Sequence, residues 1–176
     1  MTIAGPWREP PDLDTDLEGA ELSFGPADSE LAQEMEAFGQ RANTLTPEDI
    51  SALARHQGLV GFEVEFEAPY KRQYAQAALR FAAEAMKAGG AAVYVETGAK
   101  VFGPEAFIKH LNPKDPSILL HFFVEVLGDG TFIATEGMQA FDLPEIAVRY
   151  SDDNASWAQG AAFGLAAKMV CDRFKP

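Results

Sequence analysis

The stretch LVGFEVEFEAPYKRQYAQAALRFAAEAMKAGGAAVYVET, residues 59–97, decides the predicted fold. Between residues 60 and 67, apolar side chains alternate with glycine and glutamate, which is the period of a strand with one buried face. Pro69 then begins a segment whose alanine and aromatic residues recur at helical spacing, and a Gly-Gly pair ends it. The following AAVYVET is predicted as a second strand. A strand–helix–strand unit favours two parallel strands joined by a right-handed connection.

Shorter elements on both sides of this unit predict an α+β fold. The sequence TPED at 46–49 is a strong helix start, because threonine caps, proline suits the first turn and the acids complement the helix dipole. A Gly-Asp-Gly turn joins a long predicted strand at 117–127 to a returning antiparallel strand at 131–135. Further helices are predicted at 26–41, 104–111 and 154–173, and a last strand at 145–150. The predicted architecture is a two-layer mixed sheet of about five strands, with the 70–88 and 154–173 helices packed on one face. The small residues Gly160 and Gly164 are expected to let the last helix approach the sheet closely.

Residues 1–24 are predicted to form an acidic, proline-containing N-terminal arm, followed by a single α+β domain over 25–176. Pro6, Pro10, Pro11 and the five acidic residues between Glu9 and Glu18 disfavour a regular helix in the arm and leave few apolar residues to bury. Trp7 and Leu13 are the side chains able to attach the arm to the domain.

The chain is strongly acidic, with 27 Asp and Glu against 14 Lys and Arg in 176 residues, which gives a net charge of −13. Such a field repels nucleic acid and anionic membranes and attracts a basic partner, although acidity also serves solubility. The start MTIAGPWREPPDLD lacks the basic and apolar regions of a signal peptide, and no apolar run approaches the roughly 20 residues of a membrane span. A cytoplasmic protein is therefore expected. Cys171 is the only cysteine, which excludes an internal disulfide and a cysteine-based zinc site.

The predicted sheet face away from the two long helices carries the most suggestive polar residues. A glutamate beside His121 would form an acid–base pair, and two carboxylates with this histidine would hold a divalent metal ion. The simpler interpretation is a solvated face, because an open sheet shows polar residues to water. No compact metal, catalytic, phosphate-binding or cofactor motif occurs, so no catalytic residue, metal ligand or cofactor is assigned. The candidate binding residues are Glu63, Glu65, Glu67, Glu96, His121, Glu125 and Arg149.

The other histidines and the cysteine are expected to be structural. His56 and His110 lie near the C-terminal ends of predicted helices, where a cation complements the helix dipole. Cys171 lies among apolar residues of the last predicted helix, without a basic neighbour fixed by sequence to lower its pKa, and is expected to be an inert thiol.

The segment TEGMQAFDLPEIAVRY, residues 135–150, is predicted to be a structural corner. Gly137 is expected to adopt a backbone conformation that other residues disfavour, and one helical turn would aim Met138 and Phe141 inward. The acidic residues of this segment would surround a cation only if the fold oriented them together, which the pattern does not indicate. The residues of this signature are Thr135, Gly137, Met138, Phe141, Pro144 and Glu145.

Three segments resemble an uncharacterised bacterial family that is catalogued only as a domain of unknown function. They are KAGGAAVYVETGAKVFGPEAF at 87–107, FFVEVLGDG at 122–130 and TEGMQAFDLPEI at 135–146. The last matches the family's T-x-G-[ML]-x-x-F-x-x-P-[ED]-[IL] signature, with Asp142 where the family more often has glycine. The resemblance covers about residues 70–150. It implies a bacterial α+β domain and transfers no catalytic residue.

The leading functional hypothesis is a non-catalytic protein-interaction domain that binds a basic partner through an acidic surface. The acidic N-terminal region, the glutamate-lined sheet face and the lack of a catalytic motif favour it. The alternative is an enzyme that binds a small ligand or a divalent metal with the His121 and glutamate cluster on the open sheet face. A third possibility is an accessory domain that works as a homo-oligomer, against which the repulsion of like acidic faces argues.

Overall fold

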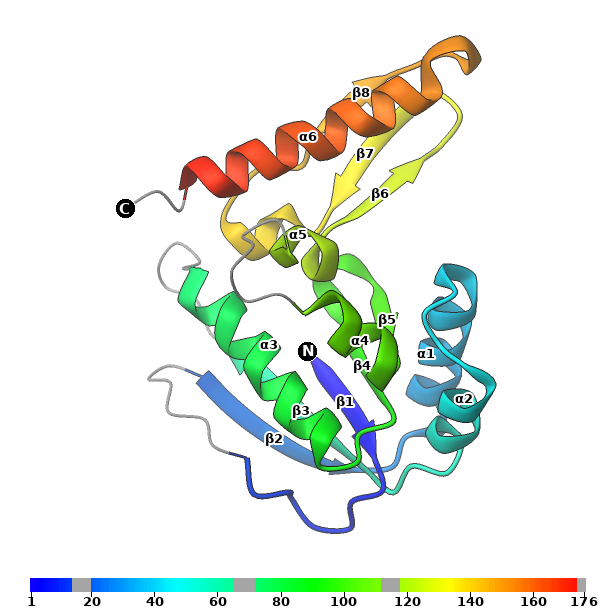
Figure 1. The fold of residues 1–176 in the computed structure, drawn as a ribbon, viewed down its shortest axis with the longest axis vertical. Coiled ribbons are helices and arrows are strands. Elements are labelled where there is room, and N and C mark those ends of the chain that lie inside the picture. Colours follow the sequence, from blue (N-terminus) through cyan, green and yellow to red (C-terminus); the bar gives the residue numbers. More distant parts are fainter. Residues whose placement is uncertain (14–19, 65–71, 112–117, 174–176) are drawn as a thin grey trace.

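A five-stranded antiparallel sheet forms the larger part of the computed structural model, which describes residues 1–13, 20–64, 72–111 and 118–173 (Figure 1). The strand order is β2-β3-β1-β4-β5, and each neighbouring pair is antiparallel. The strands are β1 (Thr2–Gly5), β2 (Ala20–Pro26), β3 (Gly58–Val64), β4 (Ala92–Val95) and β5 (Lys100–Phe102).

The first residues of the chain supply the central strand of this sheet, so the predicted arm is wrong for Thr2–Gly5. β1 pairs with β3 on one side and with β4 on the other. Because both partners are antiparallel to β1, β3 and β4 run parallel to each other, as predicted, but they are not neighbours. β2 spans Ala20–Pro26 and so crosses the predicted boundary at residue 25. The attachment expected of Trp7 is confirmed, since its indole Nε1 donates to the Ala88 carbonyl at 3.0 Å.

Helices cover both faces of the five-stranded sheet. α3 (Arg72–Lys87) lies on one face, where the Phe81 and Phe62 rings are 5.3 Å apart. On the other face lie α1 (Ser29–Ala42) and α2 (Pro47–Leu53), whose buried residues pack against those of β1 and β4. The predicted start of α2 is confirmed by reciprocal hydrogen bonds between Thr46 and Asp49. The sheet face opposite α3 is therefore covered where α1 lies on it, and it is open only outside that area.

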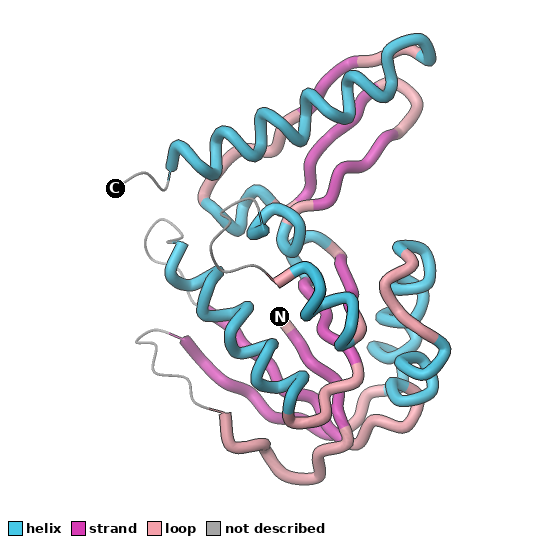
Figure 2. The backbone as a smooth tube through the Cα atoms, viewed as in Figure 1, coloured by secondary structure: helices cyan, strands magenta, loops and turns pink. Residues whose placement is uncertain are grey.

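A second, three-stranded antiparallel sheet packs against the last helix (Figure 2). It consists of β6 (Glu125–Gly128), β7 (Phe132–Glu136) and β8 (Ala147–Arg149), and α6 (Ala155–Arg173) crosses it. The predicted hairpin through Gly-Asp-Gly is formed, and the α+β class is confirmed. α6 buries every fourth residue against this sheet, namely Ala158, Ala162, Ala166 and Val170. The close approach expected of Gly160 and Gly164 is wrong, because a Cβ at either would meet no atom within 4 Å.

The segment predicted as one long strand at 117–127 is instead a short helix followed by β6. α5 (Ile118–Phe123) lies between the two sheets. The helix that precedes it in the chain, α4 (Pro104–His110), was predicted. Leu119, Leu120, Phe122 and Phe123 are all buried, so apolar residues flank His121 on both sides in the segment. A short run of this kind has no periodicity that separates a buried strand from a buried helix. Three single turns complete the fold: η1 (Glu96–Gly98), η2 (Met138–Phe141) and η3 (Asp152–Asn154).

Candidate functional site

The seven candidate binding residues do not share one sheet face, which corrects the sequence-based expectation. Glu63 is the penultimate residue of β3, and Glu96 begins η1 directly after β4, so both lie at the same end of the larger sheet. His121 is on α5 and Glu125 is on β6, while Arg149 is on β8 of the smaller sheet. Glu65 and Glu67 lie outside the described residues. Only the pair Glu63 and Glu96 is retained as a candidate site.

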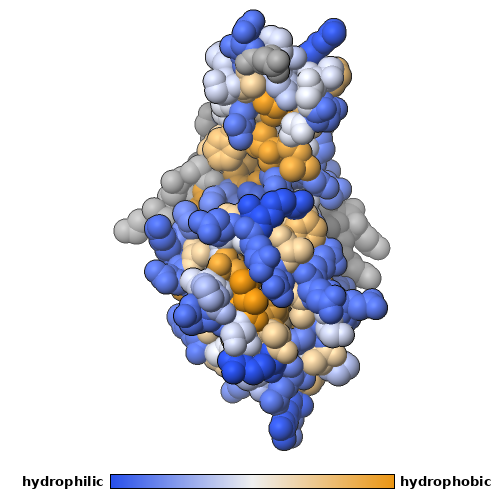
Figure 3. Space-filling model, turned by 90° about the vertical axis from the view of Figure 1, so that its right-hand side faces the viewer, coloured by the Kyte–Doolittle hydropathy of each residue, from blue (hydrophilic) through white to orange (hydrophobic). Residues whose placement is uncertain are grey.

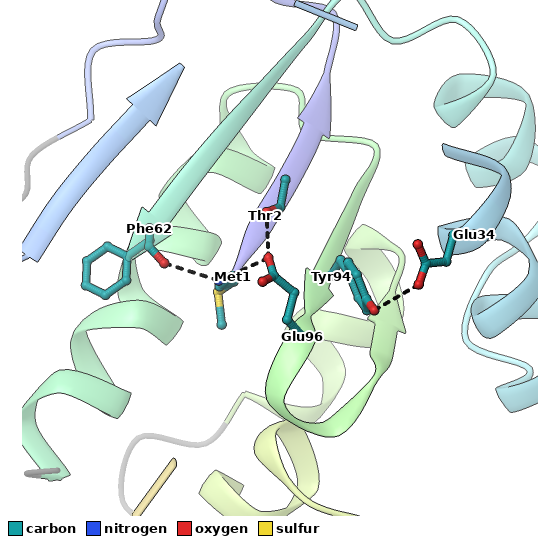
Figure 4. A network of polar contacts seen from close by, with 6 residues as sticks. All are labelled: Met1, Thr2, Glu34, Phe62, Tyr94 and Glu96. Atoms are coloured by element: carbon teal, nitrogen blue, oxygen red, sulfur yellow. Dashed lines mark hydrogen bonds and ion pairs between the residues drawn. The ribbon is translucent and has the colours of Figure 1, made fainter. Parts of the chain in front are cut away.

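The N-terminal residues hold Glu96 at this end of the sheet (Figure 4). The Met1 amino group donates to the Phe62 carbonyl at 3.1 Å and lies 3.7 Å from Glu96 Oε1. The Thr2 hydroxyl donates to the same Glu96 oxygen at 2.9 Å. Thr2 is in register with both Gly61 and Tyr94, which explains why the start of β1 can reach the ends of β3 and β4. The side chain of Glu96 nevertheless remains 58% exposed, so it is accessible to a ligand.

A cavity of about 450 Å³ opens beside this network. Its polar lining includes Glu63, Glu96 and Gln139, which are exposed and mark its mouth. Its apolar lining comes from Met1 and from β3, α3, β4, α5 and η2, which contribute Phe62, Val64, Ala78, Val95, Phe123 and Ala140. The volume is in the range of small-molecule pockets, and an apolar wall with a few polar groups is their usual composition.

The surface around the cavity mouth is strongly negative. Glu63 is directly opposite Glu21 in the β2–β3 ladder, a pairing of like charges that destabilises a sheet. On the same side of the sheet, burial raises the pKa of Tyr94 to about 12, and the charge and hydrogen bond of Glu34 and the charges of Glu96 and Glu136 act in the same direction. The Tyr94 hydroxyl donates to Glu34 at 3.2 Å. Carboxylates from α1, η1 and β7 therefore lie near this end of the larger sheet.

His121 belongs to a different cluster, beside His110 and Lys100. Its ring centroid is 4.1 Å from that of His110 and 5.6 Å from that of Phe102. Burial, together with the charges of His110 and Lys100, lowers the pKa of His121 to about 4. Lys100 donates to the His121 carbonyl at 2.7 Å, and burial lowers its own pKa to about 8 against the opposing effect of Glu125. The predicted glutamate–histidine acid–base pair is therefore not formed, because the charged groups that act on the His121 ring are cationic.

Acidification is expected to destabilise the fold through His121. The pKa of this group is about 4 in the folded chain against about 6.5 in the unfolded chain, so the unfolded chain binds the proton first as the pH falls. The His121 contribution to stability is complete above about pH 6.5 and declines from there toward pH 4. Urea unfolding at about pH 7 and pH 5 measures it, and H121F, which keeps a ring among aromatic neighbours, should show a smaller loss. An equal loss in wild type and H121F would contradict the assignment.

No group of three or more His, Cys, Asp or Glu residues in the described ranges is placed to hold a metal ion. The metal-binding alternative therefore gains no support from the geometry of this part of the chain.

The segment at 135–146 forms a structural corner, as predicted. Met138 and Phe141 are fully buried in η2, and Gly137 has a φ of 109°. Glu145 completes the corner in a way that the sequence did not indicate. Its carboxylate accepts from the amides of Gly137 and Met138, both at 2.9 Å, and from the Thr135 hydroxyl at 2.7 Å. The corner therefore uses Glu145 as an internal acceptor, and it presents Gln139 and Ala140 to the cavity.

Thr135→Val is expected to lower the free energy of unfolding by about 2 kcal/mol. The Thr135 hydroxyl accepts from the buried Ile146 amide at 2.8 Å while donating to Glu145, so valine leaves both groups without this partner. Urea unfolding monitored by circular dichroism measures the effect. Thr131→Val is the control, because Thr131 is exposed and the change should stay within about 0.5 kcal/mol. Equal losses would show that the Thr135 hydroxyl has no special role.

The cavity residues that the sequence did not reveal come from very short elements. Met1 directly precedes the four-residue strand β1, and Gln139 is the exposed residue of a single helical turn, so neither carries a periodic signal.

Comparison of the chain with protein-family models, with curated proteins and with solved structures finds no match. The resemblance of residues 70–150 to a bacterial family therefore stays a prediction. In the described parts of the chain, no helix combines the length and the apolar character needed to span a membrane.

Proposed function

We propose that this chain is a non-catalytic interaction domain that binds a basic polypeptide at the acidic end of its larger sheet. The observation that carries the proposal is the pair of exposed carboxylates, Glu63 and Glu96, at the mouth of a cavity with an apolar wall. Among the residues that the structure describes, the Met1 amino group is the only cation in an ion pair with either of them. Most of their negative charge is therefore available to a partner.

The arrangement of charge supports a cationic partner in two further ways. The Glu21–Glu63 pair costs stability in the free protein, and a bound cation would relieve this repulsion. The net charge of −13 would also accelerate the approach of a basic molecule and slow that of an acidic one.

Apolar residues also reach the surface in separate patches, one over the part that holds β6–β8 and α6 and one over the part that holds the larger sheet and its helices (Figure 3). The exposed apolar side chains of the smaller part include Leu127, Phe132 and Trp157. Nothing in their arrangement specifies a partner, so the proposal rests on the acidic end alone.

The test compares two pairs of substitutions that remove the same charge from different places. Fluorescent decalysine is titrated with wild type, with E63Q/E96Q and with the control E48Q/E105Q, whose glutamates are exposed on α2 and α4. Anisotropy at low salt should show affinity about tenfold weaker for E63Q/E96Q and nearly unchanged for the control. An equal loss of affinity in both double variants would mean that decalysine binding depends only on the net charge, and the proposed site would be wrong.

A further inference from the structure

We propose that the cavity beside Met1 is the anchor site for one long cationic side chain, arginine or lysine, of the basic partner. This inference rests on the proposed function and deepens it, because it assigns the decisive contact to a single residue of the partner. The stem of that side chain would lie on the apolar wall, and its charged head would lie at the mouth between Glu63 and Glu96.

The apolar wall suits the methylene stem of such a side chain. Phe62, Val95 and Phe123 are each at most 4% exposed and are held by packing within the main core. The Phe62 ring contacts Phe81 of α3, so this part of the wall is formed before any ligand arrives. Lysine and arginine commonly cover apolar surface with their stems while the charged head stays near water. A compact inorganic cation would leave this wall unused.

The charges at the mouth match a single positive charge. Glu63 and Glu96 contribute two negative charges, and the Met1 amino group, 3.7 Å from Glu96 Oε1, contributes one positive charge. The net charge of these three groups together is therefore −1, which one bound cation would neutralise. A bound cation would stabilise Glu63 more than Glu96, because the cross-strand neighbour of Glu63 is Glu21. A neutral side chain would fill the same volume without relieving this repulsion, and an anionic one would increase it.

Substitution of Gln139 can change the opening of the cavity without altering its carboxylates, Glu63 and Glu96. It is exposed at the mouth, and the hydrogen bonds of Glu145 to the neighbouring corner hold the turn that carries it. A large side chain at this position would obstruct the cavity, whereas a small one would leave it open. Because Gln139 lies on the surface, either change should be tolerated by the fold.

The first experiment uses the wild-type protein and pairs of short peptides. Capped glycine peptides that contain one arginine or one lysine are compared by calorimetry with the same peptides carrying citrulline or norleucine, which are neutral and similar in shape. At least one charged peptide should bind about tenfold more tightly than its neutral counterpart. No preference for either charged peptide would overturn the inference.

The second experiment separates the cavity from the acidic surface. Q139W should weaken the charged peptide about tenfold, whereas Q139A should bind it as wild type does, with circular dichroism confirming that both variants fold. Unchanged binding to Q139W would overturn the anchor site. Decalysine binding that depends on Glu63 and Glu96, combined with no charge preference for the single-residue peptides, would leave the proposed function standing while the anchor inference fails. Loss of both would refute both.

Discussion

Gly137→Ala is expected to lower the free energy of unfolding by about 4 kcal/mol or more. The φ of 109° at Gly137 strains any residue with a side chain. In addition, a Cβ at this position would clash with the carbonyl oxygen of Phe123. That oxygen belongs to the backbone at the end of α5, so the clash is relieved only if α5 and the corner move apart. Urea unfolding followed by circular dichroism measures the loss.

Gly130→Ala is the matched control for this prediction. Gly130 also has a positive φ, of 91°, but a Cβ there would meet no atom within 4 Å. The control therefore isolates the backbone strain, and its expected cost is about 1 kcal/mol. If the two substitutions cost the same, the contact between the corner and the end of α5 would contribute nothing to stability.

Ile3→Asp is expected to prevent folding. Ile3 is completely buried at the centre of the larger sheet, in register with Val60 on one side and Val93 on the other. An aspartate there would place a charge among apolar side chains with no partner, which costs more than the total stability of many domains. The expected result is an unfolded far-ultraviolet circular dichroism spectrum and poor dispersion of amide proton signals.

Two controls identify the cause of this loss. Ile3→Val keeps an apolar β-branched residue and should cost about 1 kcal/mol. Leu22→Asp puts the same charge on the edge strand β2, where Leu22 is 44% exposed, and the protein should remain folded. A folded Ile3→Asp variant would contradict the central position of β1.

The parts of the fold that the sequence predicted well are those with a long or chemically distinct pattern. The alternation that begins at Val60 and the stripe of α3 have clear periods, and the capping box at Thr46 has few alternatives. β1 was missed because four residues, followed at once by Pro6, show neither a period nor a strand boundary. Its role comes entirely from pairing with β3 and β4, residues far away in the chain.

The candidate site was predicted only in part, for a related reason. Glu63 and Glu96 were correctly expected on one surface, because each belongs to a predicted strand in which the alternation of apolar and polar residues is visible. His121 was placed wrongly because the apolar residues on both sides of it favoured a strand, whereas tertiary packing selects α5. Glu145 was recognised as part of the corner, but its role depends on amide directions at Gly137 and Met138 that a sequence pattern does not contain.

The central position of β1 also has a consequence for how the chain reaches its native state. During synthesis, Ile3 leaves the ribosome long before either Val60 or Val93, its two partners in the sheet. The larger sheet therefore cannot close until β4 has emerged, and its formation depends on contacts between residues far apart in sequence. Such non-local pairing slows folding, because the entropy of closing long loops is lost before the contacts form. The hairpin of β6 and β7, by contrast, joins residues only a short turn apart and can form at once.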